Sequence, residues 1–109
     1  DYARLGMLLA NGGHMGDRKL IRSSWIAAMS SMAFTPGQTG RYVGYGYQTW
    51  ILPGQKPTFG LFGVRGQYVF VDPDNRLVMV NTAVRSDPRD RGNAATFALW
   101  GGVRSALAT

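Results

Sequence analysis

Side chains that could carry acid–base or metal chemistry are scarce in this sequence. His14 is the only histidine and there is no cysteine, so the chain offers no metal cluster of the usual kind. The histidine lies among glycines in NGGHMGD, a setting typical of an exposed turn rather than of a catalytic base. The sequence contains no glycine-rich phosphate loop ending in Lys-Ser or Lys-Thr. We therefore expect neither a metal nor a cofactor.

A serine nucleophile with a lysine base is also missing from the sequence. Such a pair needs the spacing S-x-x-K on a helix, which places both side chains on one face. The two lysines are Lys19 and Lys56, and the residues three places before them are Gly16 and Pro53. Neither of these can be the nucleophile, so the chain by itself lacks a serine–lysine catalytic pair.

The carboxylates of this chain are all aspartates, and most of them stand in turns. Four of the six acidic residues lie in stretches rich in Pro, Asn and Arg. Asp in such a stretch normally accepts hydrogen bonds from the nearby backbone. We therefore expect a local structural role for Asp72, Asp74, Asp87 and Asp90.

Composition indicates one small, soluble, globular unit. The chain has 109 residues, of which 45% are apolar and 17% charged, and this is enough apolar surface for a core. No stretch approaches the roughly 20 apolar residues of a membrane span, so no membrane partner is expected. The chain starts at Asp1 without a Met and enters a helical pattern at once, which we interpret as an entry partway through a larger protein.

The net charge of +6 raises the question of nucleic acid binding. Proteins that bind the nucleic acid backbone tend to cluster their basic residues on one stripe, whereas the arginines here are scattered along the whole chain. A solvated surface is the better interpretation. We expect no nucleic acid partner, and a basic nucleic-acid-binding module is the weaker alternative.

Apolar periodicity predicts three helices and four strands. The i, i+3, i+7 spacing in DYARLGMLLANGG indicates a helix ended by glycine, and the period-two pattern of YVGYGYQTWIL indicates a strand. The dipeptide Gly16-Asp17 indicates a small hairpin or an extended loop. The helices are expected at about residues 2–10, 24–32 and 93–108, and the strands at about 42–52, 58–64, 67–71 and 77–84.

These elements predict an α+β fold, in which helices pack on an antiparallel sheet within a single segment, residues 1–109. The strand LVMVNTAV at 77–84 is apolar on both faces, so we expect a central strand that is covered on both sides. The three short helices are few for covering both faces of the sheet. We therefore expect an exposed sheet face or edge, and with it a homo-oligomer or a tightly held partner chain.

An arginine between glycines follows the apolar run of the second strand, in FGLFGVRGQYVFVDP. Glycine inside a strand pattern weakens the strand and usually marks a bulge or a place where something must approach the backbone. Gly63, Arg65 and Gly66 therefore mark this stretch as the candidate site. We interpret the approaching group as a substrate.

Three stretches together resemble the C-terminal third of the β-lactamase-related serine hydrolases. They are DYARLGMLLANGGHMGDRKLIRSSWI, YGYQTWILP and FGVRGQYVFVDPDNRLVMVNTAVRSDP, in the family's order and over nearly the whole chain. The superfamily includes class C β-lactamases, D-alanyl-D-alanine peptidases, carboxylesterases and nylon-oligomer hydrolases. G-x-x-G-Q followed by V-D-P is similar to the esterase and nylon-oligomer branch.

The resemblance implies a fold like the C-terminal part of a β-lactamase, and a site that this chain completes only in part. In the family the nucleophilic Ser, its Lys and a catalytic Tyr lie upstream, and Tyr2 belongs to the first helix instead. The chain retains the strand whose third motif ends in a glycine, followed by a residue that offers its N–H to the oxyanion. By resemblance Gly63 is that glycine and the Val64 N–H the donor. The registers TFG at 58–60 and VRG at 64–66 stay open, with Leu61 or Gln67 as donor.

The resemblance also suggests side chains that could bind a substrate. Arg65 could hold a substrate carboxylate as a planar fork, or project into solvent from a tight turn. Gln67 closes the G-x-x-G-Q motif and joins Arg65 as a candidate. Tyr47 and Trp50 could line a substrate wall, or serve as core or sheet-face residues.

The function implied by the resemblance is hydrolysis of ester or amide bonds through an acyl-enzyme. The partners implied are a small ester or amide substrate and the missing N-terminal part of the same enzyme, or else a second copy of the chain. We expect the chain alone to be inactive, because the nucleophile is absent. The alternative is a binding or interaction domain without catalysis.

Overall fold

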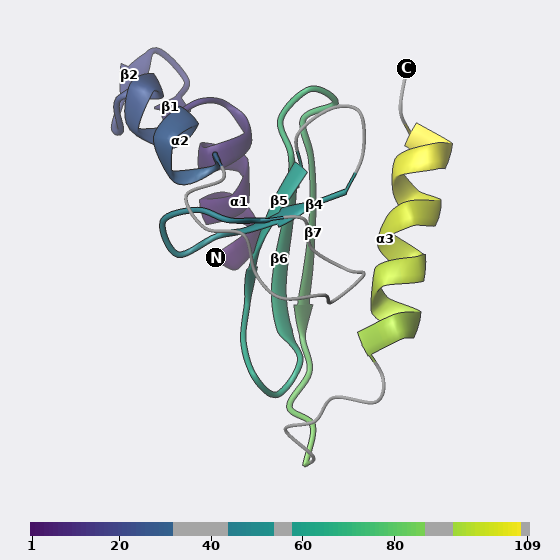
Figure 1. Cartoon of the computed structure of the whole chain (residues 1–109). Coiled ribbons are helices and arrows are strands. Elements are labelled where there is room, and N and C mark those ends of the chain that lie inside the picture. The colour runs from purple at the N-terminus through teal and green to yellow at the C-terminus, as the bar shows by residue number, and fades with distance from the viewer. Residues whose placement is uncertain (32–43, 54–57, 87–92, 108–109) are drawn as a thin grey trace.

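The computed structural model describes residues 1–31, 44–53, 58–86 and 93–107. Within these ranges an antiparallel sheet is flanked by helices on its two sides (Figure 1), which confirms the α+β class. The helices are α1 (Tyr2–Ala10), α2 (Ser23–Met29) and α3 (Asn93–Leu107). The strands are β1 (His14–Met15), β2 (Arg18–Lys19), β3 (Gly44–Tyr45), β4 (Trp50–Leu52), β5 (Thr58–Phe62), β6 (Gln67–Asp72) and β7 (Leu77–Thr82).

The main sheet follows the order of the chain, β3-β4-β5-β6-β7, with every neighbouring pair antiparallel. Strands β1 and β2 form a separate hairpin in which His14 pairs with Lys19, so the hairpin indicated by Gly16-Asp17 is confirmed. In β5 and β6 the register pairs Phe62 with Tyr68, and this leaves a short connection between the two strands. None of the described helices has the length and apolar content needed to cross a membrane.

Strand β6 carries the core of the protein, because its alternate side chains enter two different apolar clusters. Val69 and Val71 pack with residues of α1 and α2, while Tyr68 and Phe70 pack with residues of α3. Phe70 and Val71 are neighbours in sequence and both are fully buried. The period of two along a strand thus sorts one apolar run onto two faces, and each face receives its own helix (Figure 1).

The predicted strand at about 42–52 is wrong as a single element. The structure has two short strands there, β3 and β4, which pair with each other as Gly44 with Ile51 and Tyr45 with Trp50. Between them the Gly46 N–H donates to the Thr49 carbonyl over 2.8 Å, which closes a turn. Residues 42–43 of the prediction lie outside the described residues.

A contact with α2 explains this turn, and the contact is invisible in the local pattern. The Met29 carbonyl at the end of α2 accepts hydrogen bonds from the Tyr47 N–H, over 3.0 Å, and from the Thr49 hydroxyl. A side chain on Gly46 would collide with that same carbonyl oxygen. The alternation of aromatic residues and glycines therefore encodes a hairpin that docks on a helix end.

The expectation that the strand at 77–84 is covered on both sides is confirmed, whereas within the described sheet it is not a central strand. Val78 and Val80 pack against the α1 cluster, and Leu77 and Met79 against the α3 cluster, so both faces are covered. In the described part of the chain, however, β7 pairs only with β6 and is the last strand of the sheet. Helices on both faces make a strand apolar throughout, whether or not it has two neighbours.

Helix α1 lies unusually close to the sheet at one point, Gly6. A Cβ atom built there would be 2.5 Å from Val78 Cγ1 and 3.2 Å from Val69 Cγ1. Valine side chains are stiff because of their branching at Cβ, so they cannot move aside easily. The glycine therefore sets the distance between α1 and the two strands beneath it.

We expect Gly6→Ala to destabilise the protein, although alanine favours helices. Overpacking costs about 1–3 kcal/mol, which exceeds the gain of about 1 kcal/mol in helix propensity. The matched control is Gly102→Ala in α3, where a Cβ would meet no atom within 4 Å. Urea unfolding should show a lower midpoint for Gly6→Ala and a higher one for the control. Equal gains from both changes would contradict the close packing of α1.

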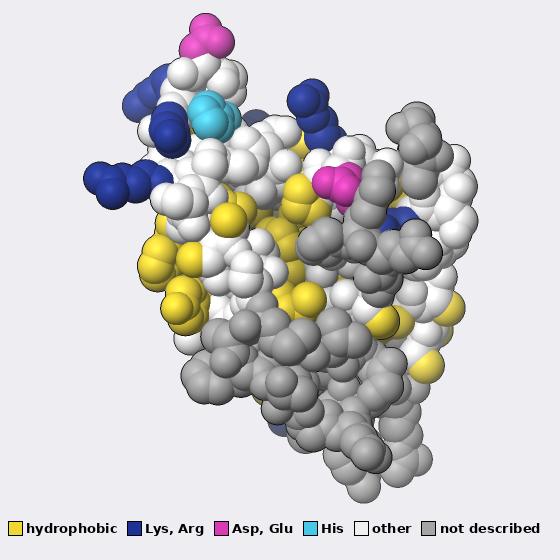
Figure 2. Space-filling view, turned by 45° about the horizontal axis from the view of Figure 1, so that its top comes forward, with side chains coloured by type: hydrophobic (Ala, Val, Ile, Leu, Met, Phe, Trp, Pro, Cys, Tyr) yellow, Lys and Arg dark blue, Asp and Glu magenta, His cyan; other side chains and the backbone are white. Residues whose placement is uncertain are grey.

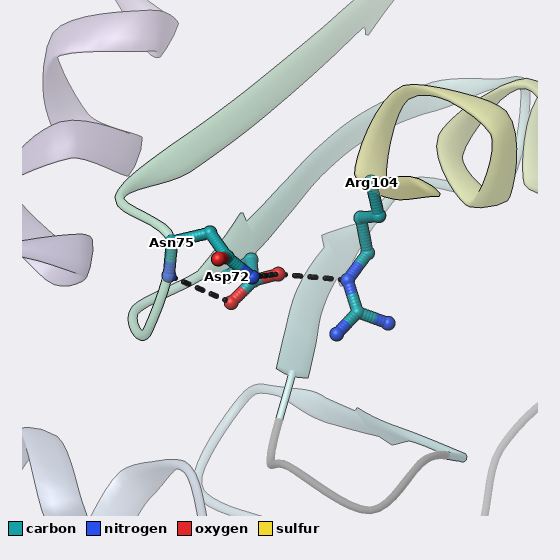
Figure 3. A network of polar contacts seen from close by, with 3 residues as sticks. All are labelled: Asp72, Asn75 and Arg104. Atoms are coloured by element: carbon teal, nitrogen blue, oxygen red, sulfur yellow. Dashed lines mark hydrogen bonds and ion pairs between the residues drawn. The ribbon is translucent and has the colours of Figure 1, made fainter. Parts of the chain in front are cut away.

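The far end of β6 is fastened to α3 by a buried carboxylate (Figure 3). Asp72 is fully buried, and its Oδ2 accepts a hydrogen bond from Arg104 Nε over 2.7 Å. Asn75 donates to the same carboxylate from its side chain over 3.0 Å and from its backbone over 3.3 Å. Burial raises the pKa of Asp72, but the hydrogen bonds from Asn75 and Arg104 outweigh it, so the pKa lies below its ordinary value.

This depressed pKa predicts a loss of stability in acid. In the folded chain the carboxylate stays ionised at pH values below about 3.9, which is the pKa of an aspartate in an unfolded chain. Its contribution to the free energy of unfolding is therefore complete above a pH of about 3.9. It is lost as the pH falls from about 4 through the lower folded pKa. Urea unfolding of the parent chain and of Asp72→Asn should differ most near neutral pH and converge in acid. A difference that stays constant down to pH 2 would contradict the assignment.

Candidate functional site

The glycine-flanked arginine lies in the connection between β5 and β6. The Gly63 N–H donates to the Gln67 carbonyl over 2.6 Å, and the Gly66 N–H points back to the Gly63 carbonyl at 3.5 Å. Gly66 has a φ of 99°, whereas Val64 and Arg65 are not among the residues with positive φ. This combination is a type I turn followed by a left-handed glycine, a common way to connect two antiparallel strands.

Gly66 is required by this turn, because its positive φ is costly for any residue with a Cβ. For Gly63 the structure gives a packing reason within the chain itself. A Cβ on Gly63 would lie 2.6 Å from Gln67 Oε1 and 3.2 Å from Gln67 Cβ. The group that approaches Gly63 among the described residues is therefore the Gln67 side chain. Substrate approach at Gly63 stays a prediction.

Val64 is exposed on the turn, with 70% of its surface accessible. It occupies the first central position, directly after the residue whose N–H is used by β6. Within the described part of the chain, the Val64 N–H makes no hydrogen bond. An exposed backbone donor on a well-held turn can bind an anion or a carbonyl oxygen, although no structural contact tests that role here.

The side chain of Arg65 contacts the chain that follows β7. Its Nη1 donates to two backbone carbonyls, that of Arg85 over 3.2 Å and that of Ser86 over 2.6 Å. In return the Arg85 N–H donates to the Arg65 carbonyl over 2.8 Å. The guanidinium fork therefore binds the chain that follows β7. Arg65 is also exposed, and its role in binding a substrate carboxylate stays a prediction.

Tyr47 and Trp50 belong to two separate aromatic pairs. Tyr47 stacks on Trp25 with ring centroids 5.5 Å apart, and Trp50 packs against Tyr45 at 4.6 Å. Both pairs lie along the β3–β4 hairpin and its contact with α2. The structure does not bring either residue to the hollow described next, so their role in binding substrate stays a prediction.

A hollow of about 540 Å³ lies between the start of α1 and the sheet, beside the turn. Its walls are mainly apolar, and none of its lining residues is charged. Gly63 and Gln67 reach this hollow, so two of the candidate site residues are brought together there. The lining also includes Tyr2 and Leu5 from α1, Leu61, Phe62, Tyr68, Val69, Val80, Asn81 and Thr82 from the sheet, and Gln48.

Gln48 is a lining residue that sequence reasoning missed. Its φ is 63°, an uncommon conformation for a residue that has a side chain. The turn that forces this conformation is held by the Met29 carbonyl, through the Tyr47 N–H and the Thr49 hydroxyl. Local sequence carries no signal for this, since glutamine gives no hint of a left-handed backbone.

Among the described residues that line the hollow there is no Ser, Cys, His, Lys or carboxylate side chain. Among the described residues no three His, Cys, Asp or Glu side chains lie close enough to hold a metal ion. Figure 2 shows the histidine side chain at the surface beside Lys and Arg side chains. The described lysine, Lys19, is exposed on β2, and Lys56 lies outside the described residues.

Comparison with known proteins identifies the family. The β-lactamase family model matches residues 1–100, so this chain belongs to the β-lactamase family of hydrolases. Among solved structures, the chain is similar to a Bacillus anthracis protein described as a 6-aminohexanoate-dimer hydrolase, with 24% identity and a TM-score of 0.65. That match covers 100% of this chain and 29% of the other, and it shows a shared fold. The curated proteins contain no match.

The contact between Gly63 and Gln67 gives a test of the packing around the turn. We expect Gly63→Ala to push the Gln67 side chain away and break its hydrogen bond to the Ala83 carbonyl, which is 2.9 Å long. The cost should be about 1 kcal/mol, the usual net value of one hydrogen bond. In a Gln67→Ala background the same change should cost little or stabilise. Equal costs in both backgrounds, measured by urea unfolding, would show that the two residues are not coupled.

Proposed function

We propose that this chain is the C-terminal portion of a serine hydrolase that cleaves ester or amide bonds through an acyl-enzyme. In this proposal the chain supplies the oxyanion-binding strand and the missing N-terminal part supplies the nucleophile. The observation that carries it is the exposed Val64, whose N–H has no described partner, on a hydrogen-bonded turn beside an uncharged hollow, in a chain of the β-lactamase family.

The reaction assigns one task to this chain. A serine oxygen from the other part forms a bond to the substrate carbonyl carbon, and the carbonyl oxygen gains the displaced electron pair. The Val64 N–H and the serine N–H stabilise that negative charge, which a fixed donor can do without reorganising. The C–O or C–N bond then breaks, and the alcohol or amine leaves with a proton. Water releases the acid and restores the serine.

The hydrogen-bond pattern of β5 supports Val64 over the two alternative donors. Because the Gly63 N–H points to β6, alternation along the strand points the Leu61 N–H to β6 as well. Leu61 pairs with Val69 in that ladder, so its donor is used. Gln67 is the first residue of β6, placed between Gly63 on one side and Thr82 on the other. Of the three candidate N–H donors, this leaves that of Val64, which lies on the turn outside both strands.

The exposed apolar surface supports the proposal that the chain is part of a larger catalytic unit. Tyr2 and Leu5 of α1 are exposed beside the hollow, and β7 has an open edge within the described sheet. The chain spans 29% of the similar Bacillus anthracis protein, so a partner segment of more than twice its length is available in that architecture. We propose that this segment covers the hollow, and a second copy of the chain is the alternative.

The lining of the hollow bears on the substrate class. Its apolar walls and the carboxamides of Gln48, Gln67 and Asn81 suit an uncharged chain that carries an amide or ester group. The similar protein is described as acting on a dimer of 6-aminohexanoate. A small linear amide is therefore our preferred substrate, with esters as the alternative.

Val64 allows a sharp test in the intact enzyme that contains this chain. Val64→Pro removes the proposed donor, and proline fits the first central position of a type I turn, so the fold should be retained. We expect kcat to fall by about a hundredfold or more, the usual cost of one oxyanion donor. Val64→Ala keeps the N–H and should stay near the parent rate. A p-nitrophenyl ester and a linear amide serve as substrates, and normal turnover by Val64→Pro with unchanged circular dichroism would refute the assignment.

A further inference from the structure

Two arginines bind the β5–β6 turn to the chain that follows β7. Arg65 Nη1 donates to the carbonyls of Arg85 and Ser86 over 3.2 and 2.6 Å, and the Arg85 N–H donates back to the Arg65 carbonyl over 2.8 Å. The two segments are 20 residues apart in sequence. Their backbones are therefore joined by contacts that run in both directions.

The side chain of Arg85 adds a second layer to this contact. Its guanidinium lies 5.8 Å from the centroid of the Tyr68 ring, and its Nη2 donates to Thr96 Oγ1 over 3.0 Å. A Cβ on Gly66 would come within 2.9 Å of Arg85 Nη1, so the planar group lies directly against the turn. Arg85 thus connects the turn, β6 and α3 with one side chain.

Two carboxamides complete the attachment of the turn. Asn81 Nδ2 donates to the Gly66 carbonyl over 3.0 Å, and Gln67 Nε2 donates to the Ala83 carbonyl over 2.9 Å. Each residue from Arg65 to Gln67 is therefore tied to the stretch 81–86. Val64 stands at the tip and has no hydrogen bond to another described residue.

We propose that Arg85 is a positioning residue, which holds the β5–β6 turn and thereby fixes the direction of the Val64 N–H. Arg65 acts with it, so its donors serve the turn rather than a substrate carboxylate. The proposal rests on the proposed function for the meaning of Val64, but the attachment itself is independent of it. Through Thr96, the position of the donor is coupled to the docking of α3.

The physical reason for an arginine is its shape. A planar guanidinium can lie flat against Gly66 and Tyr68 while one edge reaches the Thr96 hydroxyl, whereas a lysine ammonium is a single charge on a flexible stem. A donor that is held in advance does not need to reorganise when charge develops on the substrate oxygen. Arg85→Lys keeps the positive charge and removes the planar guanidinium group, so this substitution tests the contribution of the planar shape alone.

The mobility of the turn can be measured in this chain by NMR relaxation. In the parent, the amide order parameters of residues 64–66 should be near about 0.85, and in Arg85→Lys they should fall below about 0.6. Thr96→Val, which removes only the hydroxyl acceptor, should give a smaller decrease in the same residues. Unchanged order parameters in both variants would overturn the proposal.

A matched control separates this effect from a general loosening of α3. Arg104→Lys weakens the attachment of α3 to Asp72, at the opposite end of β6 from the turn. It should lower the melting temperature and leave the order parameters of residues 64–66 unchanged. If Arg104→Lys mobilises the turn as much as Arg85→Lys does, Arg85 has no specific positioning role. If Arg85→Lys does not fold, Thr96→Val against Arg104→Lys decides the same question.

Kinetics in the intact enzyme give a second readout. Arg85→Lys should lower kcat by about ten- to a hundredfold, with KM within about twofold, because a misplaced donor affects the transition state more than substrate binding. A rise in KM with unchanged kcat would contradict positioning. If instead Arg85→Lys mobilises the turn while Val64→Pro leaves turnover normal, the attachment is real and the proposed function fails.

Discussion

The structure depends on the burial of one strand between two helical layers. Strand β6 sends Val69 and Val71 into the α1 cluster and Tyr68 and Phe70 into the α3 cluster, so the apolar contacts of both layers meet on it. A shift of one residue in its register would exchange the two sets of side chains. The register in turn fixes where the strand begins and ends. The turn with Val64 stands at one end, and the buried carboxylate of Asp72 at the other.

Sequence reasoning succeeded where a pattern is generated by a single element. The helix at 2–10 and the strands near 58–64, 67–71 and 77–84 follow from periodicity, because each buries one or two complete faces. It failed for 42–52, where a carbonyl of α2 bends the chain into a hairpin. Long-range contacts of this kind leave no period in the sequence, so local patterns cannot reveal them.

The candidate site shows the same difference between features that follow from local sequence and features that depend on long-range contacts. The glycines and the turn were found from residue types, since a left-handed position such as Gly66 strongly favours glycine. The partners of the turn were not found, because Arg85 and Ser86 belong to a segment that only the folded sheet brings beside Arg65. Gln48 was missed for the same reason: its backbone conformation is imposed by α2.

The arginines explain why a basic composition need not indicate an acidic ligand. Arg65 binds backbone carbonyls, Arg85 binds a hydroxyl beside an aromatic ring, and Arg104 binds a buried carboxylate. Each uses one nitrogen of its guanidinium group to join segments that are distant in the chain. These three guanidinium groups therefore form contacts within the protein itself. The hollow beside Val64 is lined by uncharged residues. In the proposed function, the Val64 N–H at the edge of this uncharged hollow stabilises the negative charge that develops on the substrate carbonyl oxygen.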